Sequence, residues 1–261
     1  MSLLNVSKLT RNFGGLTAVF EASLHIDKGE LIGLIGPNGA GKTTLFNVLT
    51  GVYPPSSGPI ELTIDDKTTS LGGKAPHRIC AAGVGRTFQN IRLFKDLTVL
   101  ENVMIALQQN VPYNLFASLL HIPPYGASER RIREESQELL DLMGLGRKSD
   151  ELARNLSYGE QRHLEIARAL ATRPSLLLLD EPAAGMNPAE TAELTGLIAQ
   201  LRRDFGLTVL LIEHDMSLVM KICERIYVLD HGIVIASGTP SEVRNNPKVI
   251  EAYLGEEAPS A

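Results

Sequence analysis

The chain has 261 residues, of which 44% are hydrophobic and 21% are charged, and its formal net charge is −5. This composition is typical of one large or two small folded domains and excludes a disordered chain, while 25 Lys and Arg against 30 Asp and Glu exclude the overall positive charge of a nucleic-acid-binding protein. No apolar run approaches the roughly 18 residues that a membrane-spanning helix needs, so we expect no part of the chain to cross a membrane unaided.

The first quarter of the chain is predicted to be rich in strands. Residues 1–9 lack the basic and apolar regions of a secretory signal, which predicts a cytoplasmic protein. Residues 3–64 contain short alternating or apolar runs separated by Gly and Pro turns. The run Leu31–Ile35 is wholly apolar, and a glycine-rich turn and a predicted helix over residues 42–50 follow it. Gly51 is expected to close this helix.

The middle of the chain changes to a helical pattern over residues 74–172. Thr98 and Glu101 have the spacing of a capping box, which predicts that a helix begins there. A second helix is predicted over residues 128–143, with Gly144 as its end. Residues 110–127, which are rich in Pro and Tyr, are expected to form an irregular insert.

Strands return in the last third, at residues 176–179, Thr208–Ile212 and 225–229, with a helix over 188–203 between the first two. Apolar runs without alternation indicate parallel strands that are buried on both faces. No internal repeat is present, so any feature that needs two copies must come from a second chain.

The two cysteines, Cys80 and Cys223, are far apart and form no C-x-x-C pair. This spacing argues against a disulfide framework and against a zinc site. Both are expected to be structural thiols.

The turn after Leu31–Ile35 fits the phosphate-binding pattern G-x-x-x-x-G-K-[ST]. Its four fixed positions would occur by accident in roughly one chain in a hundred of this length, and the turn lies between a buried strand and a helix, as this loop must. Its backbone N–H groups would surround phosphate oxygens, Lys42 would reach the outer phosphates and Thr43 would bind Mg²⁺. The predicted phosphate-binding residues are Gly36, Pro37, Asn38, Gly39, Ala40, Gly41, Lys42, Thr43 and Thr44. This loop alone leaves kinases, GTPases, helicases and transport ATPases open.

Polar side chains follow the predicted parallel strands, where ligands gather in such sheets. Asp180 and Glu181 end the run at 176–179, which suits Asp180 for a magnesium shell and Glu181 for polarising an attacking water, although an acidic pair can also be structural. His214 follows Thr208–Ile212 and would reach the same edge to contact a γ-phosphate. Gln89 lies in the linker between the strand-rich and helical parts, where a glutamine is usually only solvated.

A serine-glycine turn at residues 157–161 precedes a predicted helix that runs to about Thr172. Ser157 and Glu160 have the spacing of a capping box, which an ordinary helix start would explain. Gly159 in the first turn disfavours the helix by about 1 kcal/mol, and a phosphate at this helix N-terminus would explain its presence.

The sequence L-S-x-G-E-Q at 156–161, followed by Arg162, residues 167–170 and the L-L-L-L-D-E-P strand, resembles the signature of ATP-binding cassette (ABC) ATPases. The resemblance covers nearly the whole chain. It implies an α/β P-loop NTPase fold, with a RecA-like parallel-sheet core, an N-terminal antiparallel β subdomain and an inserted helical subdomain. The implied single domain divides into a core at 1–90 and 172–240, the helical signature subdomain at 91–171, and a C-terminal helix and tail at 241–261.

The resemblance also implies roles for individual residues. Two such chains dimerise head to tail, and each ATP lies between one chain's phosphate loop and the other's signature. Phe13 would stack on adenine, although Phe on an early strand is more often in the core. The resemblance implies that Glu181 is the catalytic base, that His214 is the switch histidine, and that Gln89 and Lys42 also take part in catalysis. Magnesium would be bound by Thr43, Gln89 and Asp180. The residues that would contact the partner's ATP are Ser157, Tyr158, Gly159, Glu160 and Gln161.

Finer matches at residues 12–15, 86–89, 92–94, 183–188, 212–216, 246–247 and 252–255 resemble the ATPases of branched-chain amino acid importers. This implies a peripheral protein at the cytoplasmic face of the inner membrane. It would form a homodimer, or a heterodimer with a sibling ATPase, on two permease subunits that an extracytoplasmic binding protein supplies. Asn187 replaces the Asp common in the wider family and marks this subfamily. A helical segment with Ile91, Leu93, Phe94 and Leu97 resembles the face that receives a permease coupling helix. The alternatives are an ABC ATPase for urea, other amino acids or lipid, and a soluble ABC ATPase.

Overall fold

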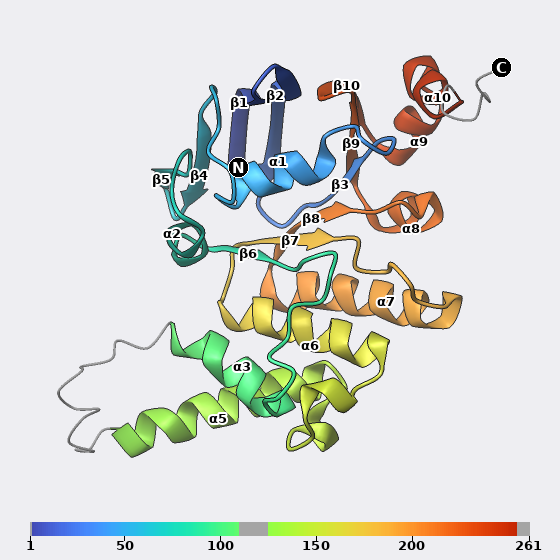
Figure 1. Cartoon of the computed structure of the whole chain (residues 1–261). Helices are drawn as coiled ribbons and strands as arrows, with labels where there is room; N and C mark the ends of the chain where they lie inside the picture. The colour runs from blue at the N-terminus through green and yellow to red at the C-terminus, as the bar shows by residue number, and fades with distance from the viewer. Residues whose placement is uncertain (1, 110–124, 255–261) are drawn as a thin grey trace.

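Two β-sheets and a layer of helices make up the computed structural model, which describes residues 2–109 and 125–254 (Figure 1). A four-stranded antiparallel sheet has the order β2-β1-β4-β5, and a six-stranded sheet has the order β10-β9-β3-β8-β7-β6. The first sheet is made of β1 (Ser2–Phe13), β2 (Leu16–Asp27), β4 (Ile60–Ile64) and β5 (Lys67–Ser70). The second contains β3 (Leu31–Ile35), β6 (Val84–Arg86), β7 (Leu176–Asp180), β8 (Thr208–Ile212), β9 (Arg225–Asp230) and β10 (Ile233–Gly238).

The central strands of the six-stranded sheet, β3, β7 and β8, are buried on both faces, as their apolar runs predict, whereas the edge strand β10 is partly exposed. Strands β9, β3, β8, β7 and β6 run parallel, and β10 pairs antiparallel with β9. Successive leucines of β7 point to opposite sides: Leu176 and Leu178 pack with the antiparallel sheet, and Leu177 and Leu179 pack with the helices. Polar side chains of these strands can therefore reach solvent or a ligand only at the strand ends.

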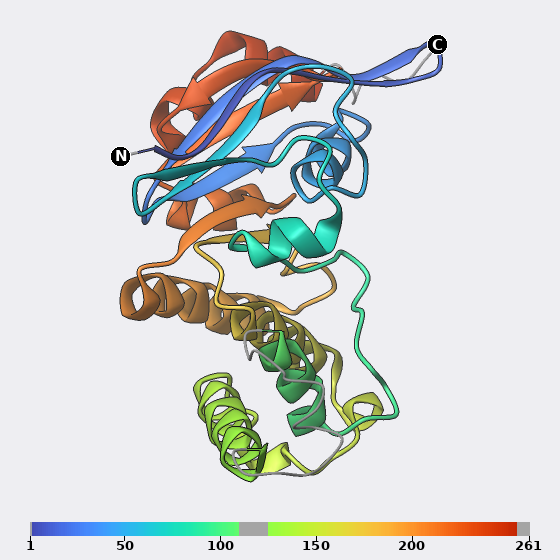
Figure 2. The same cartoon turned by 90° about the vertical axis from the view of Figure 1, so that its left-hand side faces the viewer.

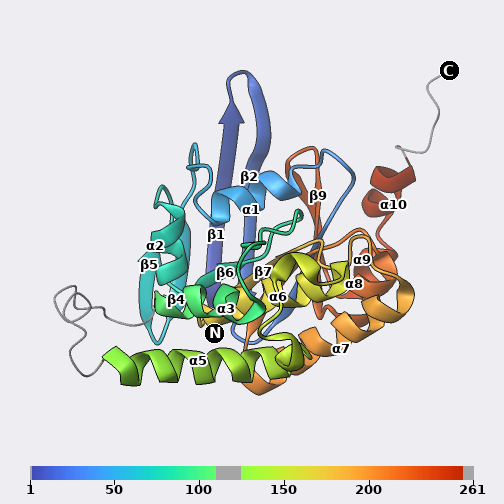
Figure 3. The ribbon, with the colours of Figure 1, turned by 60° about the horizontal axis from the view of Figure 1, so that its bottom comes forward.

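The helices lie on two sides of this sheet. Helix α1 (Lys42–Leu49) packs between the two sheets, and the larger helical layer covers the opposite face (Figures 1 and 2). That layer contains α3 (Val99–Gln108), α5 (Tyr125–Leu142), α6 (Tyr158–Ala171), α7 (Pro188–Phe205) and α8 (Met216–Ile222), with two short 3₁₀ turns at Gly146–Lys148 and Ala153–Asn155. Helices α2 (Pro76–Ala81), α9 (Pro240–Arg244) and α10 (Pro247–Leu254) lie at the edges (Figure 3).

The predicted helix ends are confirmed where a capping residue signals them. Thr98 caps α3 and Ser157 caps α6, each in a complete capping box with the glutamate three residues later. Gly51 and Gly144 follow α1 and α5 with positive φ angles. Local hydrogen bonding therefore fixes these boundaries, as the sequence indicates.

The predicted helical face around residues 91–97 is wrong, because this segment is a loop that ends in a turn. Side chains from elsewhere bind its backbone: Asn102 accepts the N–H of Phe94 and donates to the Phe94 carbonyl, each at 3.0 Å. Glu165 accepts the N–H of Arg92 at 3.4 Å. These bonds occupy groups that a helix would otherwise use.

Two other predictions in the middle of the chain need correction. Strand β6 interrupts the supposed helical region of residues 74–172 and joins the edge of the parallel sheet through β7. The irregular insert predicted at residues 110–127 lies outside the described residues up to 124, whereas residues 125–127 belong to α5. The division of the chain at residues 90, 171 and 240 stays a prediction.

The capping box of α3 provides a test of local stability. Thr98→Ala removes the hydroxyl that accepts the Glu101 N–H at 3.1 Å, so we expect the free energy of unfolding to fall by about 1 kcal/mol. The measurement is urea unfolding followed by circular dichroism. Thr191→Ala, inside α7, is the control, because alanine favours a helix interior. A loss in Thr98→Ala no larger than in this control would contradict the role of the cap.

Candidate functional site

The loop at residues 36–44 joins β3 to the start of α1. A Cβ at Gly36 would lie 1.9 Å from the Leu229 carbonyl oxygen, and one at Gly41 would lie 2.4 Å from the Ala18 carbonyl oxygen. Both positions also have positive φ angles, so only glycine fits there. The loop is therefore wedged tightly against the backbones of β9 and β2.

Lys42 lies inside the curve of this loop and is 6% exposed. Its Nζ donates to the carbonyls of Gly36 at 2.5 Å and Pro37 at 2.7 Å. Pro37 and Ala40 are buried, Asn38, Gly39 and Thr43 are exposed, and Thr44 is half-buried. The N-cap residue of α1 is Gly41, which has no side chain to cap the helix, so the first N–H groups of α1 and the lysine form a cluster of donors. Such a cluster suits an anion with several oxygens.

Three residues from three strand ends meet at the carboxylate of Glu181, which follows β7. The Gln89 Nε2 donates to Glu181 Oε2 at 2.8 Å, and His214 Nε2 lies 2.5 Å from Glu181 Oε1. Gln89 follows β6 by three residues, and His214 follows β8 by two. His214 and Glu181 therefore lie at the same edge of the sheet, as their places after parallel strands predict. Gln89, which the sequence places in a linker, joins them there and is not merely solvated.

The backbone of Glu181 is left-handed, with φ +47°, a conformation that a residue with a large side chain rarely adopts. Its N–H donates to the Ile212 carbonyl of β8 at 2.9 Å, and its side chain is 11% exposed. Backbone strain of this kind persists only where surrounding bonds hold it, and it concentrates at functional sites. The turn aims the carboxylate at Gln89 and His214 rather than along the strand.

Asp180, the last residue of β7, forms a buried ion pair with Arg86 of the neighbouring strand β6. Arg86 Nη2 lies 2.8 Å from Asp180 Oδ2, and the two side chains are 7% and 3% exposed. The Arg86 Nη1 also donates to Asn47 Oδ1 and Thr50 Oγ1 of α1 and its C-cap, each at 2.8 Å. Arg86 therefore joins the end of β7 to α1. No sequence pattern assigns Arg86 to the site, because this contact links residues 94 positions apart.

Glu213 is a second buried acid beside the site, with 4% exposure. It accepts the N–H of Ala183 at 2.8 Å and of His214 at 3.1 Å. Burial raises the pKa of Glu213, which these backbone donors oppose and the charge of Glu181 reinforces. Asp215 instead caps α8 by accepting the N–H of Ser217 at 2.8 Å. Glu213 thus holds the turn after Glu181 against the strand that bears His214.

The turn at residues 157–161 lies in the helical layer, on the other face of the sheet from α1. Glu160 pairs with Lys148 at 2.8 Å, and Gln161 Nε2 donates to the Leu156 carbonyl at 2.9 Å; the Tyr158 side chain is exposed. A Cβ at Gly159 would be in ordinary contact with the end of the Glu190 side chain, 3.5 Å from its Oε1 and 3.7 Å from its Cδ. Packing within the chain therefore does not require this glycine.

Phe13 ends β1 at the tip of the β1–β2 hairpin and is 37% exposed, so it does not belong to the core. Its ring lies edge-on to Tyr53, with centroids 5.1 Å apart, and the Arg11 guanidinium lies 4.4 Å from its centroid. An exposed ring held in this way can stack on a planar ligand.

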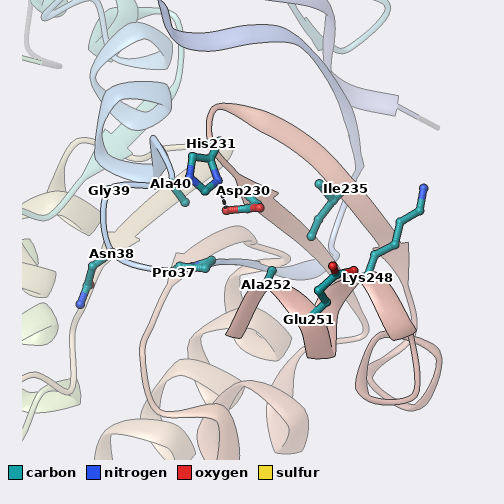
Figure 4. Close-up of a pocket in the computed structure, with 10 residues that line it drawn as sticks. All are labelled: Pro37, Asn38, Gly39, Ala40, Asp230, His231, Ile235, Lys248, Glu251 and Ala252. Carbon is teal, nitrogen blue, oxygen red and sulfur yellow. Dashed lines mark hydrogen bonds and ion pairs between the residues drawn. The ribbon is translucent and has the colours of Figure 1, made fainter. Parts of the chain in front are cut away.

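A cavity of about 780 Å³ borders the outer side of the loop at residues 37–40 (Figure 4). Its lining does not include Lys42, Asp180 or Glu181, so it lies beside the cluster of strand ends and does not contain it. The lining residues are Pro37, Asn38, Gly39, Ala40, Asp230, His231, Ile235, Lys248, Glu251 and Ala252.

Within residues 2–109 and 125–254, no helix has the length and hydrophobicity that crossing a membrane requires.

Known proteins resemble the chain over nearly its full length. Residues 19–184 match the ABC transporter family, and residues 234–259 match the branched-chain amino acid ATP-binding cassette transporter family. The high-affinity branched-chain amino acid transport ATP-binding protein LivG of Salmonella typhimurium is 50% identical over 254 residues, which are 97% of this chain and 98% of that protein.

Solved structures share the fold. The ADP conformation of MJ1267, an ATP-binding cassette of an ABC transporter, superposes with a TM-score of 0.83 at 31% identity, over 98% of this chain and 99% of that chain. The ATP-binding cassette MJ0796, bound to ADP and phosphate as a dimer, gives a TM-score of 0.75 at 25% identity, over 91% and 99%. The chain therefore belongs to the ATP-binding proteins of ABC transporters, which are nucleotide-binding ATPases, and within them to the branched-chain amino acid subfamily.

Proposed function

We propose that this ATPase energises the import of leucine, isoleucine and valine. The observation that carries the proposal is the joint hold of Gln89 and His214 on Glu181, beside a phosphate-binding loop. The cargo rests on the 50% identity to LivG and on the match of residues 234–259 to the branched-chain amino acid family. An ABC ATPase that imports or exports another cargo, such as urea, other amino acids or lipid, and a soluble ABC ATPase are the alternatives that the experiments must separate.

The phosphate loop supports binding of the ATP triphosphate. Its N–H groups and the Lys42 ammonium are the donors, and Lys42 would exchange the Gly36 and Pro37 carbonyls for phosphate oxygens, which form stronger charge-assisted bonds. Phe13 would stack on the adenine ring from the β1–β2 hairpin.

Magnesium would be held by Thr43, Gln89 and Asp180. These residues offer a hydroxyl, an amide and a carboxylate, all of them oxygen donors of the kind that Mg²⁺ prefers. The amide oxygen of Gln89 remains an acceptor while its Nε2 donates to Glu181. When bound, the ion neutralises charge on the β- and γ-phosphates.

Glu181 acts as the general base in this proposal. Gln89 and His214 each hold one of its carboxylate oxygens, at 2.8 Å and 2.5 Å, which orients the carboxylate toward the water that attacks the γ-phosphate. His214 is 48% exposed in its side chain and can turn to contact that phosphate. The reset of the transporter after closure would follow from this hydrolysis.

Two chains would share each nucleotide. The signature residues Ser157 to Gln161 lie across the sheet from α1, so one chain does not present them to its own phosphate loop. Head-to-tail pairing, with this chain or a sibling ATPase, would place the signature of one over the ATP of the other. ATP binding then favours the closed dimer by differential affinity.

The permease partners would dock beside the loop at residues 91–97. A groove of about 540 Å³ there contains Phe88, Leu93 and Phe94 together with Arg92 and Arg168, and Phe94 is 45% exposed. Apolar residues with a charged rim suit a helix from a membrane subunit. The ATPase would therefore sit at the cytoplasmic face of the inner membrane, with two permease subunits, and an extracytoplasmic binding protein would deliver the solute.

Glu181→Gln tests the general base. We expect ATP affinity to be retained while kcat for hydrolysis falls at least about 100-fold, because the amide cannot accept a proton. A phosphate-release assay gives kcat, and gel filtration with ATP should show accumulated dimer. Glu193→Gln, an exposed change on α7, is the control. Normal turnover in Glu181→Gln would exclude Glu181 as the base.

Lys42→Ala tests phosphate binding. Losing the buried ammonium should weaken ATP binding about tenfold or more, because charge-assisted bonds to the triphosphate are lost. Calorimetric titration with a non-hydrolysable ATP analogue measures the Kd, and Lys67→Ala on the exposed face of β5 is the matched control. An unchanged Kd in Lys42→Ala would refute the assignment.

The cargo is tested in cells that contain this chain, or its Glu181→Gln variant, as the only copy. We expect uptake of labelled leucine, isoleucine and valine to be lost in the variant, while a panel of other solutes is unaffected. Loss of a different solute would keep the transporter and replace its substrate. No loss for any solute would favour the soluble ATPase.

A further inference from the structure

Arg162, directly after the signature residues on α6, forms a buried ion pair with Glu165 one turn later. Their side chains are 0% and 5% exposed, and Arg162 Nη1 lies 2.7 Å from Glu165 Oε2. No role follows for Glu165 from the sequence pattern, and Arg162 served there only as part of the family signature. Neither side chain belongs to the phosphate-binding loop or to the cluster at the strand ends.

Apart from a bond from Arg162 Nη2 to the Tyr158 hydroxyl at 3.4 Å, the other bonds of this pair go to the backbone of the loop that bears Gln89. Arg162 Nη1 donates to the Phe88 carbonyl at 2.7 Å, and Nη2 donates to the Gln89 carbonyl at 3.0 Å. Glu165 Oε1 accepts the N–H of Phe88 at 3.2 Å and that of Arg92 at 3.4 Å. The pair therefore hydrogen-bonds both to backbone N–H groups and to backbone carbonyls of this loop.

The chain passes from the sheet to the helical layer at this point. The Thr87 N–H donates to the Leu178 carbonyl of β7 at 3.0 Å, whereas the N–H of the next residue, Phe88, donates to Glu165 on α6. Figure 1 shows the segment between β6 and α3 crossing α6. The backbone carbonyl of Gln89 is thus hydrogen-bonded to the signature helix α6, and its side chain is hydrogen-bonded to Glu181 at the end of β7.

Stability alone gives little reason for an ion pair in this place. Desolvation of two buried charges offsets most of their attraction, and apolar residues of similar volume are often as stabilising. Burial raises the pKa of Glu165, against the opposing charge of Arg162 and the two backbone donors. The pair supplies instead a fixed set of directed bonds to one loop.

We propose that Arg162 and Glu165 are positioning residues for ATP hydrolysis, which hold Gln89 against Glu181 and make its position follow that of the signature helix. A shift of α6 relative to β7 then moves the Gln89 carboxamide along the Glu181 carboxylate. This inference rests on the proposed role of Gln89 and Glu181, and it adds how the signature helix reaches that pair within one chain.

The rest of the loop is held by separate contacts. Arg168 Nη1 donates to the Arg92 carbonyl, and Asn102 binds both backbone groups of Phe94. These contacts anchor the loop beyond Gln89, so the fold of residues 92–94 does not depend on the ion pair alone. A change at Glu165 can therefore release Gln89 without unfolding the whole segment.

The test is a double-mutant cycle with Glu165→Gln, Gln89→Ala and both changes in the full chain. We expect Glu165→Gln to lower kcat for ATP hydrolysis about tenfold, with KM for ATP within about twofold, since the pair binds the loop at residues 88–92 and not the residues proposed to bind phosphate. In the Gln89→Ala background, the same change should lower kcat by less than about twofold.

Arg162→Lys gives a second, independent variant if Glu165→Gln is poorly folded. Lysine keeps the charge but cannot fork to two carbonyls, so kcat should again fall only where Gln89 is present. Glu135→Gln is the matched control, because this glutamate of the helical layer pairs with Arg131 and Arg173. Its kcat should stay within about twofold of the wild type.

Equal losses of kcat with and without Gln89 would overturn the proposal, because they indicate a structural role for the pair. Unchanged kcat in Glu165→Gln would overturn it as well. If Gln89→Ala itself leaves kcat unchanged, the role of Gln89 in hydrolysis fails and the inference falls with it. The cycle therefore separates failure of the positioning role from failure of the proposed site.

Discussion

Burial of the parallel sheet on both faces is the constraint on which the site depends. The side chains of β3, β7 and β8 pack against the antiparallel sheet on one side and against the helices on the other. Charged groups inside these strands would lose their hydration without compensation. Acids and other polar residues are therefore confined to the strand ends. There, the neighbouring strands β6, β7 and β8 lead to Gln89, Glu181 and His214, whose side chains meet.

Local signals account for the parts of the fold that the sequence predicted well. The run at residues 176–179 specifies a buried strand by composition alone, and Thr98 and Ser157 specify helix starts through bonds to groups three residues away. Strand β6 was missed because only three residues form it and Gly85 interrupts its apolar pattern. The loop at 91–97 was misjudged because Asn102 and Glu165, one of them over 70 residues distant, determine its backbone bonds.

The same distinction applies to the site. The phosphate loop and the meeting of the strand ends could be predicted, because one is a contiguous pattern and the other follows from parallel topology. The hold of Arg86 on Asp180 and the grip of Arg162 on the Gln89 loop could not, since each joins residues more than 70 positions apart and leaves no periodic trace. Both arginines are buried, and that burial becomes visible only in the fold.

Asn187 shows how a departure from the family pattern can be neutral for the fold. Its side chain accepts the N–H groups of Ala189 and Glu190 at 2.9 and 3.0 Å, and so caps α7. Asparagine and aspartate cap helices about equally well, so the helix start does not distinguish them. The amide does remove one negative charge from the turn that begins at Glu181, where Asp180 and Glu213 are also buried. Asn187 thus keeps the cap of α7 with an uncharged side chain.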